Sequence, residues 1–194
     1  MNEFIALDFE TATCSPNSAV SIGLVKFRDY QPVDTWYSLI RPPQLYIRPD
    51  FTAIHGLTVD DVRDAPGFGH LWENGLLDFL GELPLAAHNA SFDMGVLQAT
   101  LAFYGIPPPK NKYFCSLALS RRIWPALRSH SLSNLAKNFN IQYQAHNALA
   151  DAHVCGKIIE LCANEVCVKT ETQAPLAIKD LLKASRLRMR PLTY

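Results

Sequence analysis

Residues 4–10 read FIALDFE, in which four apolar residues are followed by Asp8, Phe9 and Glu10. A short apolar run of this kind is typical of a buried β-strand. Asp8 and Glu10 are two residues apart, so on an extended strand their side chains share a face. Carboxylates at the end of a buried strand need partners, because an unpaired charge is costly to bury. The segment therefore predicts the first strand of a sheet and part of an acidic site.

The following segments predict an antiparallel meander. Residues 20–27 and 35–40 have the composition of strands, and residues 29–32 supply the turn between them. A further strand is expected at residues 83–87. Successive strands followed by alternating strands and helices indicate an α/β protein with a mixed sheet.

Helices are expected mainly in the second half of the chain, where capping residues, glycine and proline mark their ends. Residues 44–68 are otherwise rich in loops, apart from one short helix capped by Thr58. The last expected helix is amphipathic, with Ile178, Leu181, Leu182 and Ser185 on one stripe. The expected helices cover residues 58–63, 70–80, 91–104, 116–124, 131–139, 148–166 and 176–188.

The composition is that of an ordinary globular protein. The chain has 194 residues, 48% hydrophobic and 19% charged, which is enough for one domain with a core. Its formal net charge is zero, so charge alone does not indicate nucleic-acid binding. The N-terminus does not resemble a signal peptide, and no apolar run approaches the ~20 residues of a membrane span. Five scattered cysteines without a CxxC pair suit a reducing compartment, so we expect a cytoplasmic protein.

Two other segments carry acids at predicted helix starts: HNASFD at residues 88–93 and HNALAD at residues 146–151. Asp93 and Asp151 each fall in a first helical turn, where a carboxylate also suits the helix dipole. His146 precedes Asp151 by five residues, which in a continuous helix would place the two about 140° apart. We therefore expect His146 on the loop ahead of the helix.

One strand end and two helix starts can converge on a single point. Four carboxylates within ~4 Å of one another repel by several kcal/mol per pair at intermediate dielectric, so they need cations to remain ionised. Hard oxygen ligands select Mg²⁺ or Mn²⁺. Two such ions ~3.5–4 Å apart form the clamp used for in-line phosphoryl displacement.

The three acidic segments resemble, in the same order, the Exo I, Exo II and Exo III motifs of the DnaQ-like (DEDDh) exonuclease superfamily, which includes proofreading and free-standing members. His146 precedes Asp151 by the family's five residues. The resemblance runs from about residue 3 to about residue 160. Further segments that resemble the family are IHGLT at residues 54–58, CSLA at 115–118 and HSLSNL at 130–135.

The resemblance implies a ribonuclease H-like fold, with a central mixed β-sheet flanked by α-helices. It implies an exonuclease domain over residues 1–167, followed by a basic amphipathic helix and tail over residues 168–194. That tail could grip nucleic acid, or its charges could be the solvated face of a packing helix. Its basic residues are Lys179, Lys183, Arg186, Arg188 and Arg190.

The resemblance also implies the catalytic roles. Asp8, Glu10, Asp93 and Asp151 are expected to bind two Mg²⁺ or Mn²⁺ ions, and His146 to act as the general base. The product would be nucleoside 5′-monophosphates released from a 3′ end. One departure is that no glycine follows the D-x-E-T segment, where many proofreading members read D-x-E-T-T-G. This puts terminal-base contacts in that loop in doubt, but not the metal chemistry.

Four residues are candidates for contacts with the substrate: Phe9, Thr11, His55 and Asn89. Phe9 and Phe92 could stack on a base, although core packing is the commoner role for such a residue. Thr11 could bond the terminal nucleotide. His55 could be purely structural, and Asn89 could instead cap its helix.

Three functions are compatible with these motifs. The first is an exonuclease acting on single-stranded DNA 3′ ends, which the loop at residues 54–58 favours. The second is an exoribonuclease resembling RNase T or oligoribonuclease. The third is a non-catalytic accessory of a DNA polymerase, against which the complete set of five catalytic positions argues. Residues 173–178, QAPLAI, loosely resemble a sliding-clamp-binding peptide.

Overall fold

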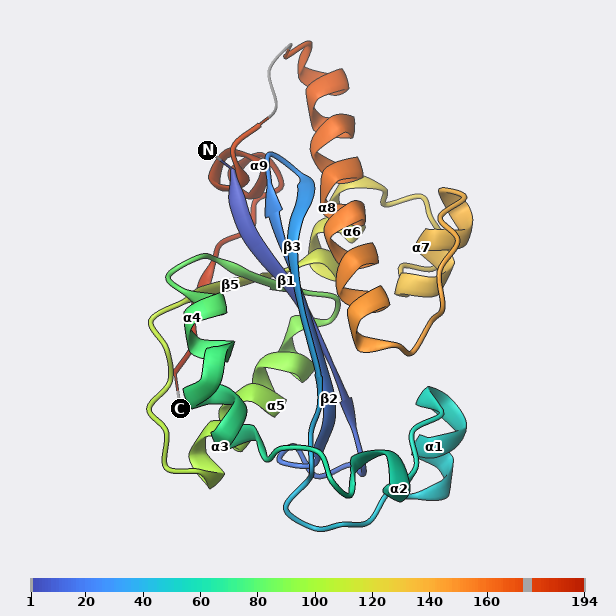
Figure 1. Ribbon diagram of the computed structural model, residues 1–194. Helices are drawn as coiled ribbons and strands as arrows, with labels where there is room; N and C mark the ends of the chain where they lie inside the picture. The colour runs from blue at the N-terminus through green and yellow to red at the C-terminus, as the bar shows by residue number, and fades with distance from the viewer. Residues whose placement is uncertain (1, 173–175, 194) are drawn as a thin grey trace.

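The computed structural model describes residues 2–172 and 176–193 (Figure 1). These residues form a six-stranded sheet in the order β3-β2-β1-β4-β5-β6. The first three strands pair antiparallel, β1 with β4 and β4 with β5 pair parallel, and β6 joins antiparallel. The predicted mixed sheet is confirmed. The strands are β1 (Glu3–Thr11), β2 (Ala19–Arg28), β3 (Gln31–Leu39), β4 (Leu85–Ala87), β5 (Lys112–Cys115) and β6 (Arg190–Pro191).

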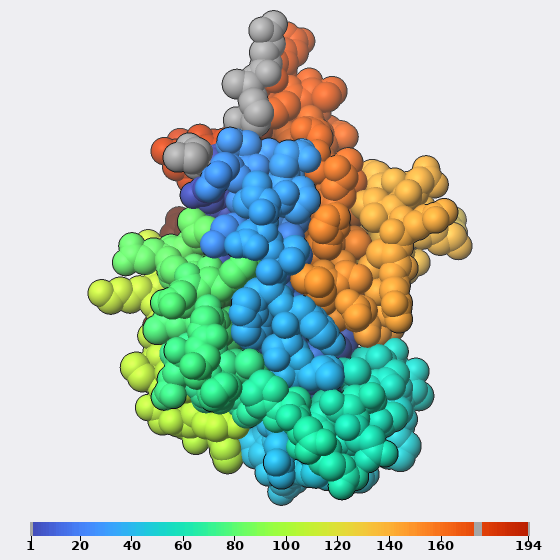
Figure 2. Space-filling view, in the orientation of Figure 1, coloured from blue at the N-terminus to red at the C-terminus, as the bar shows by residue number. Residues whose placement is uncertain are grey.

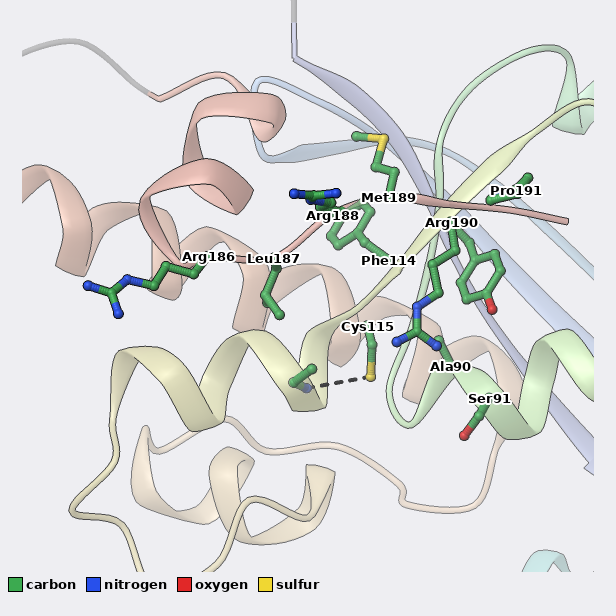
Figure 3. A pocket seen from close by; sticks show the side chains of 12 residues that line it. Ala90, Ser91, Phe114, Cys115, Arg186, Leu187, Arg188, Met189, Arg190 and Pro191 are labelled. Atoms are coloured by element: carbon green, nitrogen blue, oxygen red, sulfur yellow. Dashed lines mark hydrogen bonds between the residues drawn. The ribbon is translucent and has the colours of Figure 1, made fainter.

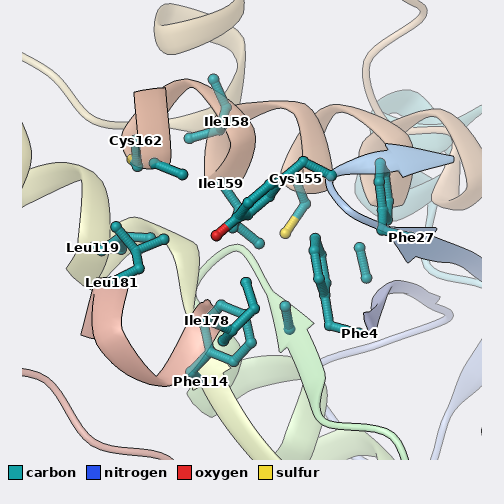
Figure 4. Close-up of a cluster of buried hydrophobic side chains, with 14 of the residues drawn as sticks. Phe4, Phe27, Phe114, Leu119, Cys155, Ile158, Ile159, Cys162, Ile178 and Leu181 are labelled. Carbon is teal, nitrogen blue, oxygen red and sulfur yellow. The ribbon is translucent and has the colours of Figure 1, made fainter. Parts of the chain in front are cut away.

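Helices cover both faces of the sheet, because alternate residues of β1 enter different cores. Phe4 and Ala6 belong to a cluster with α6 (Ser116–Ile123), α7 (Leu132–Asn138) and α8 (Ala148–Thr170), part of which Figure 4 shows. Ile5 and Leu7 belong to the opposite cluster, with α3 (Phe68–Leu71), α4 (Leu77–Leu80) and α5 (Ala90–Phe103). The sheet is therefore the middle layer of a three-layer structure. In Figure 2, β3 runs between α8 and the α3–α4 region.

The meander matches the predicted strands, but β1 is longer than expected. It continues through Thr11, so Asp8 and Glu10 lie within the strand and not just past its end. Their backbones remain paired with β2, Asp8 opposite Gly23 and Glu10 opposite Ser21. The acids are compatible with a strand because their side chains leave the sheet plane while their backbone groups stay hydrogen-bonded.

Several elements differ from the expected pattern. The helix α1 (Pro49–His55) occupies part of the segment expected to be loop; Pro49 starts it and Gly56, at φ 78°, ends it. The helix expected at residues 70–80 is interrupted by the π-helical segment η1 (Trp72–Leu76), where Asn74 and Gly75 leave helical geometry. The short α2 (Val59–Val62) has the capping interaction predicted at Thr58.

The C-terminal segment packs onto the same cores. All four residues predicted on one stripe of α9 (Ile178–Ala184) and its C-cap are buried. The helix ends earlier than expected, since Arg186 takes φ 55°, and the chain continues into β6 on the sheet edge. The domain boundary expected at residue 168 falls within α8, and that division stays a prediction. Residues 173–175 of the clamp-like peptide lie outside the described residues.

No helix in the described ranges is long and apolar enough to cross a membrane. Cys14, Cys115, Cys155 and Cys162 are free thiols. The predicted cytoplasmic location stays a prediction.

Candidate active site

Asp8 and Glu10 continue the row of β1 side chains that faces α8. Phe4 and Ala6, earlier in the same row, pack into the core beneath that helix. Opposite Asp8, Gly23 permits a close approach: a Cβ there would lie 2.3 Å from the backbone nitrogen of Leu149. The first turn of α8 therefore rests directly on the sheet. That turn carries Asp151, so strand and helix bring their acids to one place.

Asp93 reaches the same place from α5. The strand β4 runs parallel to β1, and Asn89, at φ 70°, turns the chain into the helix. Asp93 lies in the first turn and is only 1% exposed. Its Oδ1 accepts a 3.2 Å hydrogen bond from the backbone nitrogen of Phe9, between the two β1 acids. This bond ties the start of α5 to β1.

The pKa shifts show that the four acids share one environment. Burial raises the pKa of Asp8 well above its usual range, and Asp93, Asp151 and Glu10 raise it further by repulsion. Burial and the charge of Asp151 raise the pKa of Glu10 to about 7. Burial raises the pKa of Asp93 to about 8, against the effect of the Phe9 hydrogen bond. Mutual repulsion of this kind requires proximity.

His146 lies on the loop ahead of α8, as expected, with φ 61° and an exposed side chain. Asn147 caps the helix by accepting a 3.1 Å hydrogen bond from the backbone nitrogen of Ala150. The potential ligand atoms of Glu10, His146 and Asp151 all lie within 4.8 Å of one another. The structure thus brings together the five residues predicted as the catalytic set.

The donor set suits hard divalent cations. Carboxylate oxygens are the ligands that Mg²⁺ and Mn²⁺ prefer. The raised pKa values of Asp8, Glu10 and Asp93 indicate that the cluster holds protons when no cation compensates its charge. A cation would replace those protons, so the side chains present fit metal binding.

Tyr143 is a neighbour of the site that the sequence interpretation missed. Burial raises the pKa of Asp151, and a hydrogen bond with the Tyr143 side chain acts in the opposite direction. Burial also raises the pKa of Tyr143 to about 12. Its hydroxyl lies 3.4 Å from Oγ of Ser133. Tyr143 lies in an irregular loop without periodicity, so its position in the loop that carries His146 was the only available signal.

The two phenylalanines next to the acids have opposite roles. Phe9 is 2% exposed and packs against Phe68, so its ring cannot stack on a base. The prediction of Phe9 as a substrate-binding residue is therefore wrong for its side chain, and core packing is the role the structure shows. Phe92 was expected in the core, but it is 48% exposed at the start of α5. Successive side chains of a helix point in different directions, and here Asp93 points inward while Phe92 points outward.

Thr11 and His55 hold the end of β1 to the loop after α1. Nδ1 of His55 accepts from the backbone nitrogen of Leu57 at 3.0 Å, so Nε2 carries the hydrogen and donates to the carbonyl of Thr11 at 3.2 Å. Burial lowers the pKa of His55, and the nearby His146 lowers it further. Both ring nitrogens are thus engaged within the protein, and the Thr11 side chain is buried.

Asn89 occupies the cap position of α5 without a side-chain capping bond. The Oδ1 atom of its side chain instead accepts a 3.3 Å hydrogen bond from Oγ of Ser91. Asn89 lines a groove of about 760 Å³ between the start of α5 and the loop joining α6 to α7. The groove is lined by His88, Asn89, Leu117, Arg121, Arg128, Ser129, His130, Ser131 and Leu132.

His88 holds one wall of this groove in place. Its Nε2 donates to the carbonyl of His130 at 2.8 Å, so Nδ1 accepts from Oγ of Ser116, also at 2.8 Å. Burial lowers the pKa of His88 to about 4, which keeps the ring neutral at physiological pH. His88 is therefore a structural residue.

This fold places the chain in the ribonuclease H-like class. The Exonuclease family model matches residues 5–170. The chain therefore belongs to this exonuclease family, in its DnaQ-like (DEDDh) branch.

Two relatives show where such domains occur. Over 157 residues the chain is 31% identical to the DNA polymerase III subunit epsilon of Treponema pallidum, covering 78% of this chain and 72% of the relative. Over 161 residues it is 30% identical to the DNA polymerase III PolC-type of Halalkalibacterium halodurans, covering 81% of this chain. The chain spans only 11% of that much longer protein.

Solved structures share the fold. Exonuclease X, in a complex with 5′ overhanging duplex DNA, is 26% identical with a TM-score of 0.67, covering 93% of this chain and 99% of that chain. Exonuclease I is 17% identical with a TM-score of 0.74, covering 95% of this chain and 43% of that chain. The second comparison supports the fold alone.

Proposed function

We propose that this protein removes nucleotides from 3′ ends of nucleic acid, with single-stranded DNA preferred, and releases nucleoside 5′-monophosphates. The observation that carries the proposal is the convergence of Asp8, Glu10, Asp93 and Asp151 on one site, with His146 beside it. Two Mg²⁺ or Mn²⁺ ions are the cofactors that this donor set favours.

The residues divide the chemistry between them. The four carboxylates would hold the cations, and bound divalent cations supply an activated water and stabilise the departing oxygen. His146, exposed on its loop, would accept the proton of the attacking water and pass it to solvent. The Phe9 backbone and Tyr143 orient Asp93 and Asp151 by hydrogen bonds. His55 holds the loop beside β1, where the terminal nucleotide would lie.

DNA is favoured over RNA because both relatives above are parts of DNA polymerase III. Association of this chain with a polymerase stays a prediction on the same ground. An exoribonuclease remains the alternative, since these carboxylates act on the phosphate and do not read the 2′-hydroxyl. A non-catalytic accessory role is the third possibility. The presence of all five side chains expected for catalysis is evidence against it.

The test uses DNA and RNA oligonucleotides of one sequence, labelled at either end, with Mg²⁺, with Mn²⁺ and with EDTA. We expect stepwise shortening of 5′-labelled DNA, early release of a mononucleotide from 3′-labelled DNA, and no reaction in EDTA. Asp8→Asn protein purified in parallel controls for contaminating nucleases. Faster cleavage of RNA would show that the protein is an exoribonuclease. A protein that cleaves no substrate with either metal would support the non-catalytic accessory role.

A further inference from the structure

A second candidate binding surface lies at the start of α5, between this helix, the start of α6 and the C-terminal segment. The C-terminal residues 186–191, here called the arginine arm, border a cavity of about 560 Å³ (Figure 3). The opposite walls are Ala90 and Ser91 at the start of α5, and Cys115 and Ala118 at the start of α6. The match to the family model ends at residue 170, before the arm.

The arm carries concentrated positive charge. Arg186, Arg188 and Arg190 are all exposed, and no acidic residue follows Asp180 in the chain. None of the three forms an ion pair among the described residues. By contrast, Arg28, Arg48 and Arg63 each pair with an acid at 2.7 Å.

The arm is held in a defined position. Its last residues pair with β5, so that Tyr113 lies opposite Arg190. Leu192 is buried in the core beneath α5, and the carbonyl of Thr193 accepts a hydrogen bond from the side chain of Gln98 on α5. Arginines on a fixed backbone lose less conformational freedom on binding than arginines on a mobile tail.

The cavity borders the start of the helix that carries Asp93. Ser91, which lines it, precedes Asp93 by two residues in the first turn of α5. Figure 3 shows the side chain of Arg190 reaching from the arm toward this turn. On the other side of the helix start, the groove beside Asn89 carries Arg121 and Arg128. Arginines therefore line both hollows at the start of the helix that carries Asp93.

We propose that Arg188 and Arg190 bind backbone phosphates of the nucleic-acid substrate, at nucleotides beyond the one being released. Arginine suits this partner because its guanidinium donates two parallel hydrogen bonds to a phosphate. The inference rests on the function proposed above. An acidic protein segment has similar charge, but the position at the start of the helix that carries Asp93 favours the polyanion that the active site would itself process.

The experiment compares Arg188→Gln/Arg190→Gln with the wild type on two substrates. The first is a long single-stranded DNA, and the second is the 4-nitrophenyl ester of thymidine 5′-monophosphate, which has one phosphate. We expect KM for the long DNA to rise about tenfold or more, with turnover of the ester unchanged. The slope of log KM against log salt should fall by about 0.7 for each backbone phosphate that the variant no longer binds.

Two further variants make the result specific. Lys179→Gln/Lys183→Gln removes the same charge from exposed positions on α9 and should leave KM for the long DNA within about twofold of the wild-type value. Arg188→Lys/Arg190→Lys keeps the charge and should retain the salt dependence. Thermal melting checks that each variant is folded.

Three results would overturn the inference: unchanged KM for the long DNA, equal impairment on both substrates, or an equal effect in the Lys179/Lys183 control. Fluorescence anisotropy of the long DNA in EDTA separates this inference from the proposed function. If the wild type binds DNA through the arm but hydrolyses neither substrate, the nuclease proposal fails and the binding surface stands. If the wild type hydrolyses the ester while its DNA binding is independent of the arm, the binding surface fails alone.

Discussion

The backbone nitrogen of Phe9 donates a 3.2 Å hydrogen bond to Oδ1 of Asp93, joining positions 84 residues apart in the chain. Phe9 lies between Asp8 and Glu10 on β1, so the bond fixes the first turn of α5 beside both acids. The same carboxylate is thus a structural acceptor and a candidate metal ligand.

Asp93→Asn and Asp93→Ala should separate these two roles. Both should lose activity by about 10²-fold or more, because the cluster loses one charge. Asparagine keeps an acceptor for the Phe9 nitrogen, so its melting temperature in EDTA should equal or exceed that of the wild type. Alanine leaves that nitrogen unsatisfied, at a cost of about 1–3 kcal/mol. Equal melting temperatures for both variants would contradict the structural role.

His146→Ala should reduce the turnover rate by about 10²-fold or more while leaving the protein folded. The side chain is exposed on a loop, so its removal opens no cavity in the core. Mg²⁺ binding, followed by calorimetry, should persist because the carboxylates remain. Full activity of this variant with Mg²⁺ would rule out His146 as the base.

The metal-free protein should become less stable as pH rises. The pKa values of Glu10 and Asp93 are raised to about 7 and about 8 in the folded protein, above their ordinary values of 4.5 and 3.8. The folded state therefore holds protons that the unfolded state releases. The associated stability is fully present below the ordinary values and is lost as pH rises through the folded values.

Thermal melts in EDTA and in Mg²⁺ across this pH range test that expectation. The melting temperature in EDTA should fall as pH rises toward 8, since deprotonated carboxylates repel one another. Mg²⁺ should raise it more at the alkaline end, where cations no longer compete with protons. A melting temperature in EDTA that is constant with pH would show that the acids are not mutually buried.

Tyr143→Phe should weaken metal binding without abolishing activity. The substitution removes the hydroxyl that holds down the pKa of Asp151 and orients that carboxylate. We expect the Mg²⁺ concentration for half-maximal activity to rise by about tenfold, as is typical when a ligand loses its supporting hydrogen bond. Ser133→Ala, which removes the other partner of Tyr143, is the matched control and should have a smaller effect. A larger effect of Ser133→Ala than of Tyr143→Phe would show that Ser133, and not Tyr143, supports metal binding.

Gly23→Ala should destabilise the protein and inactivate it. The added Cβ would meet the backbone of Ala148 and Leu149 within 2.5 Å, and backbone cannot move aside as a flexible side chain can. We expect a loss of about 1–3 kcal/mol of unfolding free energy, because the start of α8 must shift away from β1. Gly95→Ala in α5 is the control: a Cβ there has no neighbour within 4 Å, and stability should rise by about 0.5–1 kcal/mol. Chemical denaturation measures both.

Local patterns were enough to predict the meander, most of the helices and the spacing of the acids. The period of two along β1 places Asp8 and Glu10 on one face, and capping residues mark the starts of α2, α7 and α8. These features depend on neighbours within a few residues, so they can be predicted from a single sequence. The five residues predicted for catalysis came instead from the resemblance of the three acidic segments to the exonuclease motifs.

Other features depended on contacts between distant segments. The strands β5 and β6 are four and two residues long, and pairing with their neighbours defines them more than composition does. Tertiary packing also buried Phe9, exposed Phe92 and placed Tyr143 beside Asp151. Burial and repulsion act through space, so the raised pKa values and the position of the arginine arm emerge only once the chain is folded.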